Sequence, residues 1–216
     1  MIAKNIYGSG PDSSIANIQA IDVPGKMDIP TVANSGTNVV VTYTKPAIHS
    51  SDVIAYDVEF LKSDGTTGTL TCAESLATSL TCTVTTSAVK TLTGLSVDTL
   101  IRVKVSAQNG KGWGAYSEYN SAGALIQDVP AIMSAPSVNL ASVTTTTIPL
   151  YWTAPSGIPA GGTGLTIDNY YLQVSTDAST WTDISQAVTT TTYTYAVTDN
   201  TKAYYFRIAA HNIYGW

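Results

Sequence analysis

Charged residues are scarce in this chain. They make up 12% of its 216 residues, against about 25% in a typical soluble domain. The net charge is −5, with two arginines and no basic cluster, which excludes nucleic acid and anionic membrane as partners. A surface with so few charges is poorly protected against association with other proteins. It suits a protein that is covered by neighbouring subunits or by O-linked glycan. An ordinary secreted module is an equal alternative.

Catalytic and metal-binding constellations are also missing. The two histidines, His49 and His211, have no Cys, Asp or Glu neighbour at the spacing of a metal site or a triad, so we interpret both as solvated loop residues. The glycine-rich tracts Gly110–Gly114 and Gly161–Gly164 lack a following Lys-Ser/Thr and a helix, and are interpreted as hairpin loops. The sequence therefore predicts no enzyme, cofactor or metal.

Long apolar runs and helix-forming runs are absent as well. No segment reads as a membrane span, and Met1–Lys4 does not begin a signal peptide, so an exported form would consist of mature or excerpted residues. Thr, Ser, Val, Ala and Gly are plentiful, and no long run has 3.6-residue spacing. The predicted class is all-β, without membrane insertion.

Two cysteines are present, in mirrored settings. Cys72 and Cys82 each follow a Leu-Thr pair, and Ala73–Ser79 between them is small and polar enough to turn. Two short β segments meeting at such a turn would place the cysteines face to face, which predicts a disulfide and an oxidising compartment. A pair of half-buried thiols is the alternative.

An internal repeat divides the chain. The pattern V-P-x-x-M-x-x-P begins at Val23 and again at Val129, 106 residues later. A loop pattern Ala-x-Asn ends at Asn5, Asn109 and Asn212. The predicted organisation is an orphan segment over 1–22, a module over 23–128 and an incomplete module over 129–216.

Short alternating runs recur at equivalent places in the two modules. The paired runs are Val39–Tyr43 with Ile148–Trp152, Tyr56–Phe60 with Tyr170–Val174, and Ile101–Ala107 with Tyr204–Ala210. Period-two alternation bounded by turn residues is typical of half-buried strands in a β-sandwich.

The chain resembles the fibronectin type III family in several motifs. These are the Trp-x-x-Pro of Trp152 and Pro155, the tyrosines Tyr56 and Tyr170 that open the third strand, and the A-x-N-x-x-G loops. The resemblance covers nearly the whole chain as two modules and implies an immunoglobulin-like β-sandwich for each.

The first module departs from this family pattern at two positions. Tyr43 stands where tryptophan is usual, and Ile101 stands where the family has a corner tyrosine, a role that Tyr204 can fill in the second module. The disulfide is expected to offset the lost anchor.

One strand is predicted to be out of place. The last strand of the first module, strand G, is expected over Ser121–Val129, but the second module has no counterpart before Trp216. A G-like segment instead occupies Ser13–Val23, near the start of the chain. We predict a donor strand with Ala16, Ile18 and Ala20 on one face, and an acceptor strand with Phe206, Ile208 and Ala210.

Two forms of assembly follow from this displacement. The chain is part of a longer tandem array, or the N-terminal strand of one copy fills the next copy in a donor-strand arrangement that resembles pilins. Both imply a structural or adhesive filament outside the cell or on its surface, whose partners are other copies or adjoining repeats.

The alternative function is a ligand- or carbohydrate-binding region of a larger secreted or cell-surface protein. It would use loop aromatics around Trp113, Tyr116, Tyr170 and Trp181. Trp113 and Trp216 are also candidate contact residues, unless each folds back onto its own module. The Thr-rich tracts Thr144–Thr147 and Thr189–Thr192 could carry O-linked glycan.

Overall fold

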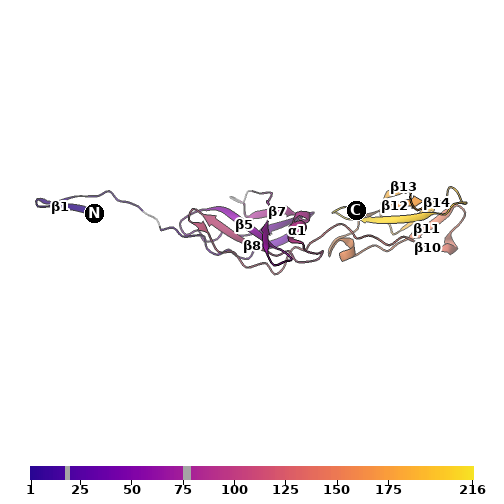
Figure 1. The fold of residues 1–216 in the computed structure, drawn as a ribbon, viewed down its shortest axis with the longest axis horizontal. Helices are drawn as coiled ribbons and strands as arrows, with labels where there is room; N and C mark the ends of the chain where they lie inside the picture. Colours follow the sequence, from indigo (N-terminus) through magenta and orange to yellow (C-terminus); the bar gives the residue numbers. More distant parts are fainter. Residues whose placement is uncertain (18–19, 75–78) are drawn as a thin grey trace.

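The computed structural model describes residues 1–17, 20–74 and 79–216. Figure 1 shows two β-rich domains following one another along the long axis, with a separate hairpin beyond the first. Among the described residues, no helix has the length and apolar character needed to cross a bilayer.

Domain 1 is a sandwich of two sheets, with strand orders β3-β4-β7 and β6-β5-β8-β9. The core is formed by alternating side chains of both sheets, among them Val39 and Val41 from one and Val58 and Phe60 from the other. Its elements are β3 (Thr31–Ser35), β4 (Asn38–Thr42), β5 (Val53–Leu61), β6 (Thr67–Thr69), β7 (Thr81–Thr85), α1 (Thr86–Thr93), β8 (Val103–Asn109) and β9 (Gly112–Trp113).

Domain 2 repeats this plan with the sheet orders β10-β11-β14 and β13-β12-β15. The counterpart of β9 is reduced here to a single bridge between Asn212 and Gly215. The elements are β10 (Ser137–Val138), η1 (Leu140–Ser142), β11 (Thr147–Tyr151), η2 (Ile158–Ala160), β12 (Asn169–Ser175), β13 (Thr182–Val188), β14 (Thr192–Ala196) and β15 (Tyr205–His211). The predicted all-β class with two tandem sandwiches is confirmed.

The corner tyrosine is present in domain 2. The Tyr204 hydroxyl donates to the Asp199 carbonyl (2.9 Å) and accepts from the Asp199 amide (3.0 Å), the contact expected from the family resemblance. In domain 1 the equivalent Ile101 is fully buried, so packing replaces the hydrogen bonds.

Helix α1 was not predicted. Its eight residues are too few for the 3.6-residue pattern to stand out, but both ends are well capped. The Thr85 side chain accepts from the Ala88 amide, and Gly94 closes the helix in the left-handed conformation at φ +65°.

The N-terminal segment begins with the exposed hairpin of β1 (Ile2–Asn5) and β2 (Gly8–Asp12). The strand predicted over Ser13–Val23 is not formed in residues 13–17 and 20–23, because a single strand has no partner for its peptide groups. Ile18 lies outside the described residues.

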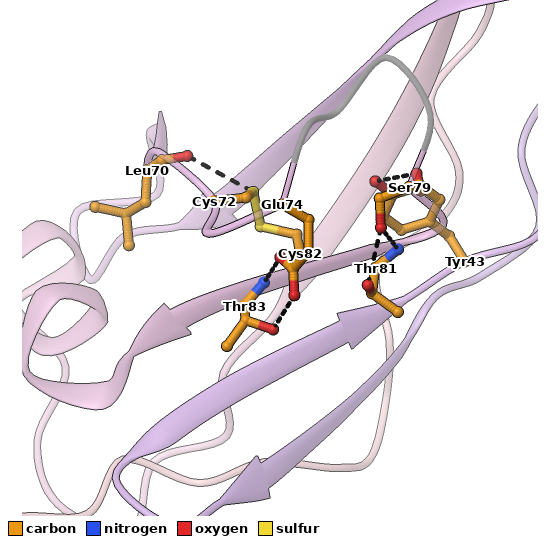
Figure 2. The surroundings of a disulfide bond; sticks show 8 residues. All are labelled: Tyr43, Leu70, Cys72, Glu74, Ser79, Thr81, Cys82 and Thr83. Atoms are coloured by element: carbon orange, nitrogen blue, oxygen red, sulfur yellow. Dashed lines mark hydrogen bonds between the residues drawn. A yellow bond between two sulfur atoms is a disulfide. The ribbon is translucent and has the colours of Figure 1, made fainter.

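The predicted disulfide between Cys72 and Cys82 is confirmed (Figure 2). Cys82 lies on β7 and is fully buried, whereas Cys72 lies in the link after β6 and not in a strand. The Glu74 carboxylate accepts from the Thr83 amide (2.7 Å) and hydroxyl (2.5 Å) beside it. Residues 75–78 of the predicted turn lie outside the described part.

The disulfide compensates for a short strand. In domain 1, β6 has three residues and a long link precedes β7, whereas β13 of domain 2 has seven residues and runs almost directly into β14. The link in domain 1 therefore needs a covalent attachment to the sheet, which the disulfide supplies.

Tyr43 connects this link to the core. Its ring lies 4.9 Å from that of Tyr56, and its hydroxyl donates to the Ser79 carbonyl (3.3 Å; Figure 2). Burial, aided by the nearby Tyr56 and Glu74, raises the pKa of Tyr43 from 10.0 to about 12.

We expect the double variant Cys72→Ala/Cys82→Ala to lower the free energy of unfolding of domain 1 by about 2–3 kcal/mol, because the unfolded chain regains the freedom of the closed loop. Denaturant unfolding followed by NMR separates the two domains, and domain 2 is the internal control. Equal midpoints for the variant and the wild type would contradict the expectation.

We expect the contribution of Tyr43 to stability to be fully present below pH 10 and lost as the pH rises from 10 to 12. The sign follows because the folded-state pKa is raised above the unfolded value. Ultraviolet titration should show one tyrosine fewer ionising near pH 12 in Tyr43→Phe, and domain 1 of this variant should be less sensitive to alkali than the wild type.

Candidate functional site

The edge of strand β15 is the most distinctive surface of domain 2. One side of β15 pairs with β12 along its whole length, from Asn169 opposite His211 to Ser175 opposite Tyr205. On the other side, no strand pairs with β15 among the described residues. Strand β15 is therefore an edge strand.

The predicted acceptor residues share the core-facing side of this strand. Ile208 (9% exposed) and Ala210 (3%) belong to the buried core of domain 2, and Phe206 is partly buried against it. Tyr205, which precedes Phe206 and lies on the opposite face, is 46% exposed. The structure thus places all three acceptor side chains on one face.

The equivalent strand of domain 1, β8, is sealed completely. Val103, Val105 and Ala107 are 0% exposed. Chain that follows β9 covers this edge: the Ser117 amide donates to the Val105 carbonyl (2.8 Å), and the Asn120 amide donates to the Val103 carbonyl (3.3 Å).

Side chains complete the covering of β8. The Asn120 side-chain oxygen accepts from the Val103 amide (2.6 Å), and the Ser117 hydroxyl accepts from the Val105 amide (3.1 Å). Further along, Ala124 is buried and its carbonyl accepts from the Ile101 amide (2.9 Å). The residues that cover β8 thus precede the segment predicted as strand G, and that segment lies beside residues 98–101, just before β8.

The predicted inward face of that segment is only partly correct. Ala124 and Ile126 are buried, but Ala122 is exposed. The strand-like contact with residues 98–101 begins only after Ala122. Before it, the Asn120 side chain donates to the Ile101 and Ala122 carbonyls.

The register shows which peptide groups of β15 face the open edge. Ile208 lies opposite Leu172 as Val105 lies opposite Val58. The N–H and C=O groups of Phe206 and Ile208 therefore point toward the open edge. In domain 1 the equivalent groups of Val103 and Val105 bond Asn120 and Ser117. Such a row of unpaired groups is a template for another strand.

The donor residues lie far from this edge. Ala16 and Ala20 are exposed in the segment between the β1–β2 hairpin and domain 1, at the opposite end of the molecule from domain 2 (Figure 1). Ile18 lies outside the described residues. Within one chain the donor and acceptor segments are not brought together.

The two candidate contact tryptophans differ in setting. Trp113 lies on β9 and is 47% exposed. Trp216 is 44% exposed, and its ring folds back to lie 5.7 Å from that of Tyr171 and 4.7 Å from that of His211. Trp216 therefore packs on its own domain.

The interpretation of His211 as a solvated loop residue is wrong. His211 is the last residue of β15, and its Nδ1 lies 2.7 Å from a carboxylate oxygen of Asp168. The two residues are 43 positions apart in the sequence, so spacing could not indicate the pair.

The aromatics of the alternative binding function are mostly engaged within the fold. Tyr170 is buried, and the Trp181 ring is covered by the Arg207 guanidinium at 4.3 Å. The Tyr116 hydroxyl donates to the Asp57 carboxylate, and burial together with that carboxylate raises its pKa. These contacts were not visible in the sequence because the partners lie on neighbouring strands.

Residues 22–122 match the sequence model of one family, the Fibronectin type III domain. This range includes all the strands of domain 1. Domain 1 is therefore a fibronectin type III-like domain. Domain 2 repeats its sheet order and carries the corner tyrosine, so the chain contains tandem fibronectin type III-like domains.

Among solved structures, the crystal structure of chicken CNTN1 FN1-FN3 domains matches with a TM-score of 0.43 and 14% sequence identity. The match covers 90% of this chain and 63% of that one, so this chain spans less than two thirds of the solved structure. Comparison with curated proteins gives no match.

We expect the amides of Phe206 and Ile208 to exchange with solvent much faster than those of Val103 and Val105, because only the second pair has hydrogen-bond acceptors at the sheet edge. Hydrogen exchange followed by NMR measures all four in one sample. Equal protection of the two pairs would show that the edge of β15 is covered in solution.

Proposed function

We propose that this chain is a non-enzymatic segment of an extracellular structural or adhesive protein, built as a head-to-tail rod of fibronectin type III-like modules. Each junction is completed when a G-type strand, of the kind found at Ala16–Ile21, pairs with an edge such as that of β15. The adjoining repeat, in the same longer chain or in a second copy, supplies this strand.

The open edge of β15 is the observation that carries this proposal. The core-facing side chains of β15 are more exposed to solvent than their equivalents in β8. The peptide groups of Phe206 and Ile208 that face the open edge have no strand as partner among the described residues. An added strand with small apolar side chains at every second position would bond these peptide groups and also bury the core side chains of β15.

The N-terminal hairpin favours the tandem array over exchange between copies. It has the same local turn as the two domains: an asparagine side-chain oxygen accepts from the amide two residues later, in Asn5–Tyr7 (2.9 Å), Asn109–Lys111 (2.9 Å) and Asn212–Tyr214 (2.7 Å). Hairpin β1–β2 therefore corresponds to β8–β9. Its strand β1 occupies the place of β15 and would have to detach from β2 before the following segment could enter a second copy.

The chemistry of the chain fits an extracellular setting. A disulfide persists in oxidising compartments, and domain 1 carries one. The low content of charge suits a surface partly covered by neighbouring modules.

We expect a chain extended after Trp216 by a copy of residues 10–22 to protect the Phe206 and Ile208 amides by about tenfold or more, because the added strand pairs with β15. The extension starts at residue 10 because Ser9 aligns with Trp216. The readouts are hydrogen exchange and the thermal midpoint of domain 2, which should rise.

A matched pair of controls tests the pairing face. Ala20→Asp in the appended copy places a charge at the position equivalent to the buried Ile126 and should abolish the protection, whereas Ile21→Asp, equivalent to the partly exposed Gln127, should preserve it. If the extension gives no protection, strand completion is wrong.

Electron microscopy separates the two sources of the strand. Fibres formed by residues 1–216 and lost on deletion of residues 1–22 would assign completion to a second copy. Protection by the appended segment without such fibres would assign it to an adjoining repeat of one chain.

A further inference from the structure

The junction between the two domains is centred on Asp128, and each of its four polar groups has a partner. Its amide donates to the Gly161 carbonyl (2.9 Å), and its carbonyl accepts from the Asn212 side-chain amide (2.8 Å). One carboxylate oxygen accepts from the Val129 amide (2.9 Å), and the other forms an ion pair with Lys90 of α1. Asp128 therefore joins the helix of domain 1 to two loops of domain 2.

The glycine-rich tract Gly161–Gly164 forms the second part of the junction. Its interpretation as a hairpin loop is wrong, because it connects β11 and β12, which belong to different sheets. The Thr163 amide and hydroxyl both donate to the Asp98 carboxylate (2.6 and 2.9 Å), and the Thr163 carbonyl accepts from the Gln127 side chain (3.1 Å). Gly161 has φ +100°, and a Cβ there would lie 2.1 Å from the Asp128 carbonyl oxygen. Only glycine permits this approach.

Tyr214 forms the third part, from the loop at the C-terminus, which Figure 1 shows beside domain 1. Its hydroxyl lies within hydrogen-bond distance of three oxygens of domain 1: the Gly36 carbonyl (3.2 Å), the Gln127 side-chain oxygen (3.1 Å) and the Thr86 hydroxyl (3.2 Å). Thr86 is fully buried. The Tyr214 hydroxyl of domain 2 thus contacts a cluster of polar groups at the end of domain 1.

The entrance to domain 1 offers an internal comparison, because the same Asp-Val-Pro sequence occurs there. The Asp22 carbonyl accepts from the Asn109 side chain (2.7 Å), and its carboxylate accepts from the Val23 amide (2.7 Å). Among the described residues, its amide and second carboxylate oxygen have no partner. Lys111 stands at the position of Tyr214. The contacts of Asp22 with its own domain therefore match those of Asp128 with domain 2.

We infer that domains 1 and 2 are locked into one stiff unit by this three-part junction of Asp128, Thr163 with Asp98, and Tyr214. Relative motion is the usual behaviour of linked domains with a small polar interface. Here the partners come from the helix α1, the domain 1 loops at Gly36 and Asp98, the linker and two loops of domain 2. A rotation about the linker therefore breaks several hydrogen bonds at once.

NMR residual dipolar couplings on residues 1–216 test the stiffness directly. We expect the two domains to share one alignment tensor in the wild-type chain. In Gly161→Ala the alignment magnitudes of the two domains should diverge by about twofold or more, because independently moving domains average their couplings separately.

Two further variants keep this test decisive if Gly161→Ala disturbs domain 2. Gly164→Ala is the matched control: it has a similar positive φ (+84°), but no atom lies within 4 Å of its added Cβ, so the shared tensor should persist.

Tyr214→Phe removes only the hydroxyl and should loosen the junction while the chemical shifts of both cores stay unchanged. Separate tensors in the wild type, or a shared tensor in both Gly161→Ala and Tyr214→Phe, would overturn the inference. Neither result depends on the open edge of β15.

Discussion

The need to pair every peptide group along the outer sheet edge constrains both domains. In domain 1 that need is met by the chain after β9, which bonds β8 through backbone and through the Ser117 and Asn120 side chains. In domain 2 the corresponding edge of β15 is open among the described residues. The two sandwiches have nearly the same strand order but differ in whether their own described residues cover this edge.

The recurring Ala-x-Asn loop has a structural role that its sequence does not reveal. In both domains the asparagine side chain of this loop donates a hydrogen bond to the carbonyl of the aspartate at the start of the same domain, Asp22 or Asp128. The loop thereby fixes the direction in which the chain enters each sandwich. Where the loop also carries tyrosine, at Tyr214, it extends this hold to the preceding domain. Tyr7 stands in a third copy of the same turn.

Features that depend on local pattern could be predicted. Period-two alternation located the paired strands, and the mirrored Leu-Thr-Cys segments indicated the disulfide. The acceptor residues of β15 share a face because alternation in a strand permits nothing else. Features without a long pattern could not be predicted: α1 has only eight residues, and its stability comes from its caps and its packing. Ala122 was misplaced because the Asn120 side chain interrupts the alternation of backbone contacts.

The sequence by itself determined the class, the two repeats, the disulfide and the alternation that sets the core face of each strand, because these depend on neighbours within a few residues. Only the tertiary structure decided which loops meet. Asp98 and Thr163 are 65 residues apart, and Tyr214 and Gly36 are 178 apart. No periodicity relates such positions, since their proximity arises when two finished sandwiches stack end to end. The glycine tract acquired its partners in the same way, whereas His211 meets Asp168 inside domain 2, across 43 residues of sequence.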